Sequence, residues 1–283
     1  SSDVCSSDLP NTPKMKTLVA VLAVLCLAEA APSPARVGFL EDMSRTRIMY
    51  GSEASVGQFP HQLSLMVRSG NYHTCGAVLV AADTALTAGH CVMPGNPTNY
   101  FVRAGQHNQG SPVSEHDVTS IDRHDDYNSG AGTYPNDIAV LYLASSADTG
   151  NSLIDDIRIC RSGDGDFAGR NCDISGWGTT DTGPSPNALQ YATMPVITKS
   201  ACQDGMQGVL GANIIDSHIC VFNSQNGACS GDSGGPMTCG DCLAGVTSWG
   251  VQSGGTCSVA HPSVYTRISE FEDWIDARIP GLP

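Results

Sequence analysis

Short apolar runs of strand length, separated by turn residues, constrain the fold of this chain most strongly. Runs of this kind occupy residues 61–67, 76–80, 100–104, 137–143, 171–176, 243–249 and 264–268. Many short strands broken by Gly, Pro, Asn and Asp favour an antiparallel β-barrel or sandwich. Only residues 269–278 read as a helix, because Phe271, Trp274 and Ile275 follow helical spacing and Pro280-Gly281 ends the pattern.

Length and charge narrow the class of protein. The 283 residues are 41% hydrophobic and 15% charged, which excludes global disorder and allows one large domain or two small ones. The formal net charge is −14 and the chain has no basic run. Nucleic acid and anionic membrane surfaces need a basic patch, so neither is an expected partner.

The N-terminal region has the pattern of a secretory leader. A basic start at Met15-Lys16, an uncharged run over 17–28 and the small-x-small end Ala28-Glu29-Ala30 predict a signal peptide over residues 15–30. The run is too short to span a bilayer. Residues 1–14 precede this Met, and we interpret them as a non-native leader. We therefore expect a secreted, extracellular protein whose cysteines form disulfides.

Three stretches carry the candidate chemistry. His90 ends an apolar run before a Cys, Asp137 heads an apolar strand, and Ser233 lies in the glycine-rich turn 231–236. A serine hydroxyl becomes a useful nucleophile when an imidazole takes its proton and a carboxylate holds that imidazole. Each stretch alone is a weak signal, but together, in this order, they predict nucleophilic serine catalysis.

The order of these residues also separates two hydrolase classes. Gly231-x-Ser233-x-Gly235 would fit the nucleophile elbow of an α/β-hydrolase, in which Asp and His follow the Ser. Here the sole His after Ser233 is His261, and the chain lacks βαβ alternation. We set that interpretation aside.

With these motifs, residues 48–283 resemble the chymotrypsin-family, or trypsin-like, serine proteases. The resemblance implies an all-β fold of two packed six-stranded antiparallel β-barrels with a C-terminal helix. The peptidase domain would divide into an N-terminal barrel over 48–158 and a C-terminal barrel and helix over 159–283. The active site would lie between the barrels.

The resemblance also assigns roles to single residues. His90 would be the general base and acid, Asp137 would orient it, and Ser233 would attack the acyl carbon. The backbone N–H groups of Gly231 and Ser233 would form the oxyanion hole. The strand Ser248-Trp249-Gly250 would pair with the substrate backbone.

Activation follows from the same resemblance. Residues 31–47 would be an activation propeptide, and a trypsin-like protease would cleave the Arg47–Ile48 bond. The new amino group of Ile48 would then be buried against Asp232. The usual Ile-Val-Gly-Gly start reads Ile48-Met49-Tyr50-Gly51 here.

Ten cysteines follow residue 47, and their spacing alone leaves the connectivity open. The resemblance suggests four pairs: Cys75–Cys91, Cys172–Cys239, Cys202–Cys220 and Cys229–Cys257. Cys160 and Cys242 remain, and we expect them to pair with each other. Cys239-Gly240-Asp241-Cys242 also has a spacing found in zinc and redox sites, but no second ligand pair is evident. Gln106 stands where relatives that bind calcium have Glu, so we predict no metal and no cofactor.

The residues that match the specificity pocket carry no charge. Gly227 lies at the pocket base, where trypsin-like members have Asp, and Ser263 occupies the other position from which an acid could act. Gly250 leaves the pocket mouth open. We therefore predict cleavage after Phe, Tyr, Leu or Met, with an elastase-like preference for small aliphatic residues as the alternative.

Taken together, the sequence predicts a secreted serine endopeptidase made as a zymogen and used in digestion. Protein or peptide substrates, the activating protease and protein protease inhibitors are the expected partners, and we expect a monomer. A regulatory protease of a cascade or venom is a second interpretation. A non-catalytic homologue that acts as a binding module is a third, although such proteins usually lack one residue of the triad.

Overall fold

The computed structural model describes residues 36–39, 48, 51–93, 95–178, 186–253 and 256–282, with the backbone alone for 36–39. All of them belong to one compact unit, Pro34–Pro283. The residues predicted as leader and signal peptide, and most of the predicted propeptide, lie outside the described part of the chain.

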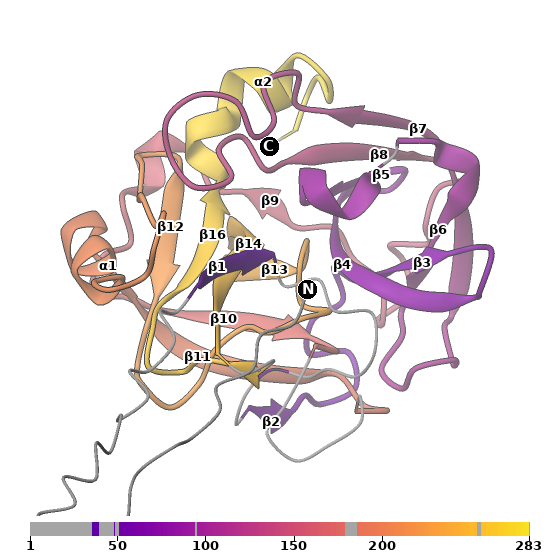
Figure 1. The fold of residues 1–283 in the computed structure, drawn as a ribbon. Coiled ribbons are helices and arrows are strands. Elements are labelled where there is room, and N and C mark those ends of the chain that lie inside the picture. The colour runs from indigo at the N-terminus through magenta and orange to yellow at the C-terminus, as the bar shows by residue number, and fades with distance from the viewer. Residues whose placement is uncertain are drawn as a thin grey trace, which may run out of the picture. The chain divides into compact units, whose positions relative to one another are not determined.

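Six strands of the N-terminal half form a closed antiparallel barrel (Figure 1). Its strand order is β3-β4-β5-β8-β7-β6, and β6 pairs with β3 to close the ring. The strands are β3 Gln62–Val67, β4 Tyr72–Ala81, β5 Thr84–Thr87, β6 Tyr100–Ala104, β7 Ser114–Arg123 and β8 Ala139–Leu143. Two 3-10 turns accompany them, η1 Gly89–Val92 and η2 Pro97–Asn99.

Six strands of the C-terminal half form a second ring. The order β14-β13-β10-β11-β12-β16 is closed by antiparallel pairing of β14 with β16. The strands are β10 Asn171–Gly176, β11 Gln190–Ile197, β12 His218–Val221, β13 Pro236–Cys239, β14 Cys242–Ser253 and β16 Ser263–Arg267. The prediction of two six-stranded antiparallel β-barrels is confirmed.

Four short strands attach to this second ring at its edges. They are β1 Arg36–Phe39, β2 Ser52–Glu53, β9 Arg158–Ile159 and β15 Thr256–Cys257. β2 pairs with β11, whereas β1, β9 and β15 pair with β14. The remaining elements before the C-terminal segment are the 3-10 turn η3 Ser162–Asp164 and the helix α1 Lys199–Gly205. The sequence did not predict α1, which Thr198 caps by accepting a hydrogen bond from the Ala201 N–H.

The C-terminal segment returns to the first barrel. The 3-10 turn η4 Ile268–Phe271 continues into the helix α2 Glu272–Asp276, which is shorter than the predicted helical run over 269–278. Ile268, Phe271 and Ile275 join the apolar cluster that contains the core of the N-terminal barrel. Burial of this apolar face, rather than length, therefore stabilises so short a helix.

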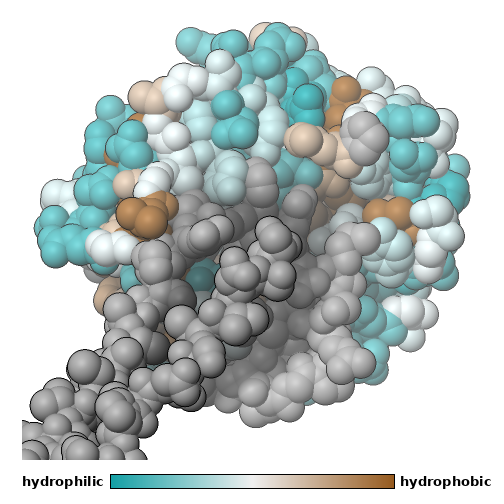
Figure 2. All heavy atoms as spheres, in the orientation of Figure 1, coloured by the Kyte–Doolittle hydropathy of each residue, from teal (hydrophilic) through white to brown (hydrophobic). Residues whose placement is uncertain are grey.

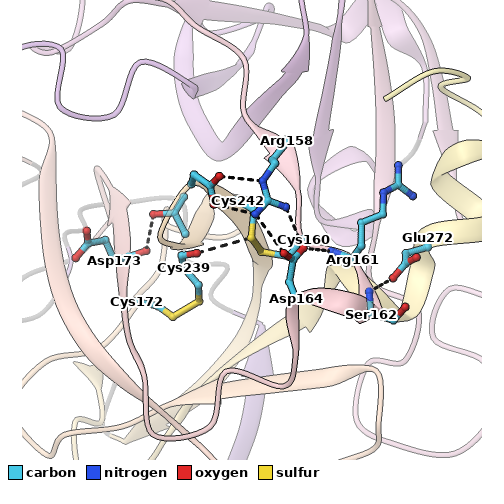
Figure 3. Close-up of a disulfide and its surroundings, with 12 residues drawn as sticks. Arg158, Cys160, Arg161, Ser162, Asp164, Cys172, Asp173, Cys239, Cys242 and Glu272 are labelled. Atoms are coloured by element: carbon cyan, nitrogen blue, oxygen red, sulfur yellow. Dashed lines mark hydrogen bonds and ion pairs between the residues drawn. A yellow bond between two sulfur atoms is a disulfide. The ribbon is translucent and has the colours of Figure 1, made fainter. Parts of the chain in front are cut away.

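Five disulfides connect the chain, and all five pairings agree with the predicted set. The Cys160–Cys242 bond links the chain just after β9 to the start of β14 (Figure 3). Beside it, the Arg158 guanidinium donates to Asp241 at 2.8 Å and to Asp164 at 2.9 Å. These contacts fix the connector between the barrels on the second barrel.

The surface of the face in Figure 2 is mostly hydrophilic where residues are described, with separate hydrophobic spots. The exposed large hydrophobic side chains of the described residues are Val56, Met93, Val113 and Leu210. Among those residues, no helix has the length and apolar character needed to cross a membrane.

Candidate active site

His90 and Asp137 form a buried pair. His90 lies on the turn η1 directly after β5, and the Cys75–Cys91 disulfide anchors its neighbour. Asp137 Oδ2 lies 2.8 Å from His90 Nδ1, and Asp137 Oδ1 accepts the His90 backbone N–H at 2.9 Å. A carboxylate only accepts hydrogen bonds, so Nδ1 carries the proton and Nε2 keeps a lone pair.

The second barrel also contacts Asp137, through its side chain and its backbone. Ser248, on β14, donates its hydroxyl to Asp137 Oδ2 at 2.6 Å. Thr266, on β16, donates to the Asp137 carbonyl oxygen at 2.7 Å. The Asp137 side chain is fully buried and accepts three hydrogen bonds, which satisfy the oxygens that burial removes from water.

Ser233 lies in a turn that only glycines can build. Gly231 and Gly234 have φ values of 88° and 76°, in the left-handed region. A Cβ on Gly234 would lie 2.2 Å from Thr87 Oγ1 and 3.2 Å from the Ala88 backbone nitrogen. The turn therefore packs directly on the chain that leads into His90.

Backbone hydrogen bonds fix the nucleophile turn to both barrels. The Gly76 N–H donates to the Ser233 carbonyl at 2.7 Å, and the Gly234 N–H donates to the Thr247 carbonyl at 2.8 Å. Ser233 Oγ is buried and has no hydrogen-bond partner among the described residues. Asp137 contacts His90 directly, and the turn that carries Ser233 packs on the residues just before His90. The catalytic roles assigned to these three residues stay a prediction.

His73 supports the backbone at the predicted oxyanion hole. Its Nε2 lies 2.9 Å from the Gly231 carbonyl and its Nδ1 lies 2.7 Å from Ser64 Oγ, so Nε2–H donates and Nδ1 accepts. Burial lowers the pKa of His73, which keeps the ring neutral for this pattern. The sequence analysis missed His73, Ser64 and Thr266, because none stands in a catalytic motif and each acts through contacts distant in sequence.

Asp232 is buried without a cationic partner among the described residues. Its carboxyl accepts the Gly178 N–H at 2.7 Å and the Cys229 N–H at 2.9 Å. Desolvation raises the pKa of Asp232 to about 7. A Cβ on Gly176 or Gly178 would lie 2.2 Å from this carboxyl group, so both positions require glycine. Ile48, the residue predicted to supply an amino group, is buried in the core of the same barrel.

The predicted specificity residues also come together in the second barrel. A Cβ on Gly227 would lie 3.3 Å from Ser263 Oγ and 3.8 Å from Val259 Cγ1, with no other heavy atom within 4 Å among the described residues. Ser263 Oγ accepts the Ala228 N–H at 3.0 Å. The described side chains that a Cβ at this position would meet, those of Ser263 and Val259, are uncharged. Trp249 is fully buried.

One cluster in the described part of the chain has the composition of a metal site. Cys75, His90 and Cys91 place their ligand atoms within 4.8 Å of one another. The two sulfurs form a disulfide, and His90 Nδ1 is hydrogen-bonded to Asp137. This cluster therefore offers no thiolate to a metal ion.

Comparisons with known proteins agree with this geometry. The Trypsin family profile matches residues 48–275. "Fibrinolytic enzyme, isozyme C" of Lumbricus rubellus is 45% identical, covering 81% of this chain and 98% of its own. "Chymotrypsin-like serine proteinase" of Haliotis rufescens is 39% identical, covering 93% and 98%. "Trypsin epsilon" of Drosophila erecta is 35% identical over the same shares. The chain therefore belongs to the trypsin family and is a serine endopeptidase.

Proposed function

We propose that this chain is a secreted digestive endopeptidase, activated by cleavage after Arg47, that cuts peptide bonds after large apolar residues. The observation that carries the proposal is the hydrogen-bonded pair of His90 and Asp137, buried beside Ser233. The uncharged side chains next to Gly227, those of Ser263 and Val259, support the proposed preference for apolar P1 residues.

In the proposed mechanism Ser233 Oγ attacks the scissile carbonyl carbon while His90 Nε2 takes its proton. The carbonyl oxygen becomes an oxyanion, which the backbone N–H groups of Gly231 and Ser233 stabilise. His90 then gives the proton to the leaving amine, and water releases the acyl group from Ser233 by the same route. Asp137 keeps the imidazole in the required tautomer and stabilises the imidazolium.

The proposed activation depends on Asp232. A buried carboxylate without a cation is costly, and the raised pKa of Asp232 reports that cost. Cleavage of the Arg47–Ile48 bond would free an ammonium group next to a side chain that already lies in the barrel core. Pairing of this group with Asp232 would fix residues 231–233 in the conformation that the oxyanion requires.

The proposed P1 preference is for Phe, Tyr, Leu or Met. A Lys or Arg side chain would be buried without a carboxylate, because Gly227 and Ser263 provide none. Gly250 leaves room for large side chains at the entrance. Cleavage after Ala or Val remains the alternative, since one methylene changes binding in an apolar pocket by only about 1–3 kcal/mol.

A P1 profile of the activated enzyme tests this function. Residues 31–283 are expressed, cleaved after Arg47 with trypsin and freed of trypsin by a selective inhibitor. Peptides that differ only at P1 are then assayed. Fibrin is assayed as a protein substrate, because the Lumbricus rubellus relative is named a fibrinolytic enzyme. We expect the highest kcat/KM after Phe, Tyr, Leu or Met.

The other outcomes have distinct meanings. Fastest cleavage after Ala or Val would move the chain to the elastase-like alternative, and cleavage after Arg would contradict the uncharged pocket. No turnover with Ile48 confirmed as N-terminus, and no labelling of Ser233 by a phosphonate probe, would favour a non-catalytic binding module.

A further inference from the structure

A segment that precedes the proposed activation bond forms a strand of the second barrel. β1 pairs with β14 in antiparallel register over four consecutive residues, from Arg36 opposite Gln252 to Phe39 opposite Trp249. Figure 1 shows β1 lying along β14. Residues 36–39 therefore have a defined place on the second barrel.

β1 occupies the stretch of the β14 edge that β13 leaves open. β13 pairs with β14 only as far as Val246. Trp249 pairs with Val264 of β16 on one side and with Phe39 on the other. The Thr247 N–H and C=O are taken by Gly235 and Gly234. Without β1, the β14 edge from Trp249 to Gln252 would present unpaired N–H and C=O groups, which is a docking site for an extended chain.

The direction of β1 leads toward the catalytic residues. Because the pairing is antiparallel, the segment enters opposite Gln252 and runs toward Ser248. The Ser248 hydroxyl donates a hydrogen bond to Asp137 Oδ2 at 2.6 Å, so this end of the open edge adjoins the proposed catalytic residues. A substrate whose backbone paired with Ser248-Trp249-Gly250 would need the same backbone groups. One edge pairs with one strand at a time, so β1 and such a substrate exclude each other.

We propose that Arg36–Phe39 is a built-in competitive ligand of the substrate strand, bound in the uncleaved chain and retained without a covalent link after cleavage at Arg47. This inference rests on the proposed function. Residues 31–47 contain no Cys, so no disulfide holds the released segment. They carry three arginines and two acidic residues, whereas residues 48–283 carry nine basic and 23 acidic residues. Long-range charge therefore favours rebinding.

The covalent link sets how strongly the segment competes. In the uncleaved chain the segment is tied to its binding site, which gives it an effective concentration on the order of millimolar. After cleavage, occupancy follows the concentration of free peptide, so dilution frees the site. The specific activity of a freshly activated sample should rise on dilution, and gel filtration should give the same rise at once.

Peptide inhibition tests the inference directly. Activated enzyme freed of propeptide is assayed on a peptide substrate that it cleaves, with added synthetic peptide of residues 31–47. We expect competitive inhibition: KM rises with peptide concentration, kcat is unchanged, and mass spectrometry recovers the peptide intact. A scrambled peptide of the same composition is the control and should not inhibit.

Single proline substitutions locate the pairing. In an antiparallel pair, adjacent residues point their N–H groups to opposite sides, so only one of Val37 and Gly38 donates to β14. Peptides with Val37→Pro and Gly38→Pro are therefore compared. One of them should raise the inhibition constant about tenfold, because a ladder carbonyl loses its donor, and the other much less.

The outcomes separate this inference from the function on which it rests. Any of four outcomes would overturn the inference alone: the peptide leaves turnover uninhibited, the scrambled peptide inhibits equally, the two proline peptides have equal effects, or the enzyme hydrolyses the peptide. Binding of labelled peptide to the Ser233→Ala enzyme, measured by anisotropy, requires no turnover. If the peptide binds to this variant but the activated enzyme with Ser233 present cleaves no substrate, the proposed function is overturned and the inference stands.

Discussion

Asp137 is the residue at which both barrels meet the proposed catalytic base. It binds His90 of the first barrel and Ser248 of the second. In Asp137→Asn, the amide can turn its NH₂ group toward Nδ1, which favours the tautomer that leaves Nε2 protonated. We expect kcat to fall about 10⁴-fold with the fold intact. Steady-state kinetics beside circular dichroism check this.

The exposed Asp125 provides a control for that substitution. Asp125→Asn removes the same charge twelve residues earlier in the chain and should leave kcat unchanged. Equal losses in the two variants would mean that net charge, rather than imidazole orientation, explains the effect.

Gly227 allows the specificity to be changed by one residue. In Gly227→Asp, the new carboxylate would lie near Ser263 Oγ, which can donate to it. Apolar P1 side chains would then leave that charge buried and unpaired. We expect kcat/KM after Phe to fall about tenfold or more and the Arg-to-Phe ratio to rise about a hundredfold. Gly227→Ser adds similar bulk without charge and should keep the apolar preference.

Among the elements, β9 pairs with β14 in parallel register, and the Cys160–Cys242 bond adds a covalent link beside that pairing. The bond spans 82 residues of sequence, but the Cys172–Cys239 bond within this span shortens the closed loop to about 15 residues, for which the chain-entropy relation gives about 3 kcal/mol of the free energy of unfolding. The double variant Cys160→Ser/Cys242→Ser should therefore unfold at lower urea concentration, measured in the Ser233→Ala chain to prevent autolysis. An unchanged midpoint would show that Arg158 and its two aspartates hold the connector without the disulfide.

Some elements could be predicted from the sequence and others could not. The strands β6 and β10 match their predicted bounds of 100–104 and 171–176, although β6 includes Arg103 and β10 alternates polar with apolar residues. The polar strand β7 was missed, since five of its ten residues are charged or His and its pairing with β6 and β8 decides its structure. The motifs led to His90 and Asp137, which the structure shows in direct contact. The supporting contacts of His73 and Thr266 were not predictable, because they depend on how distant strands meet.

At the scale of the whole molecule, buried histidines should make stability depend on pH. Burial lowers the pKa of His61 and of His218 to about 4, and that of His73 is also lowered. Between the unfolded value of 6.5 and the folded values, the unfolded chain binds protons that the folded chain does not. These histidines alone would make the free energy of unfolding fall as pH falls from 6.5 to 4, by up to about 1.4 kcal/mol per pH unit for each. Asp232 acts in the opposite sense and offsets about one histidine, because its pKa of about 7 in the folded chain exceeds the unfolded value of 3.8. The net free energy of unfolding should still fall, since three histidines act against one carboxyl group.

Urea unfolding of the Ser233→Ala chain at pH 7.5, 6 and 5 measures this dependence. The midpoint should be highest at pH 7.5 and should fall at each step. His61→Gln should reduce the dependence of the free energy of unfolding on pH, because one histidine fewer takes up a proton on unfolding. A midpoint that stayed constant from pH 7.5 to 5 would contradict the expected proton uptake.

Each end of the peptidase region is held by the barrel that it does not belong to in sequence order. β2 pairs with β11 of the second barrel, and the C-terminal segment with Ile268, Phe271 and Ile275 packs into the core cluster of the first. The two halves are therefore not interchangeable modules. A gene cut between them would yield fragments that each lack a piece of their own core, and recombination between relatives would have to exchange the terminal segments together with the barrels they stabilise.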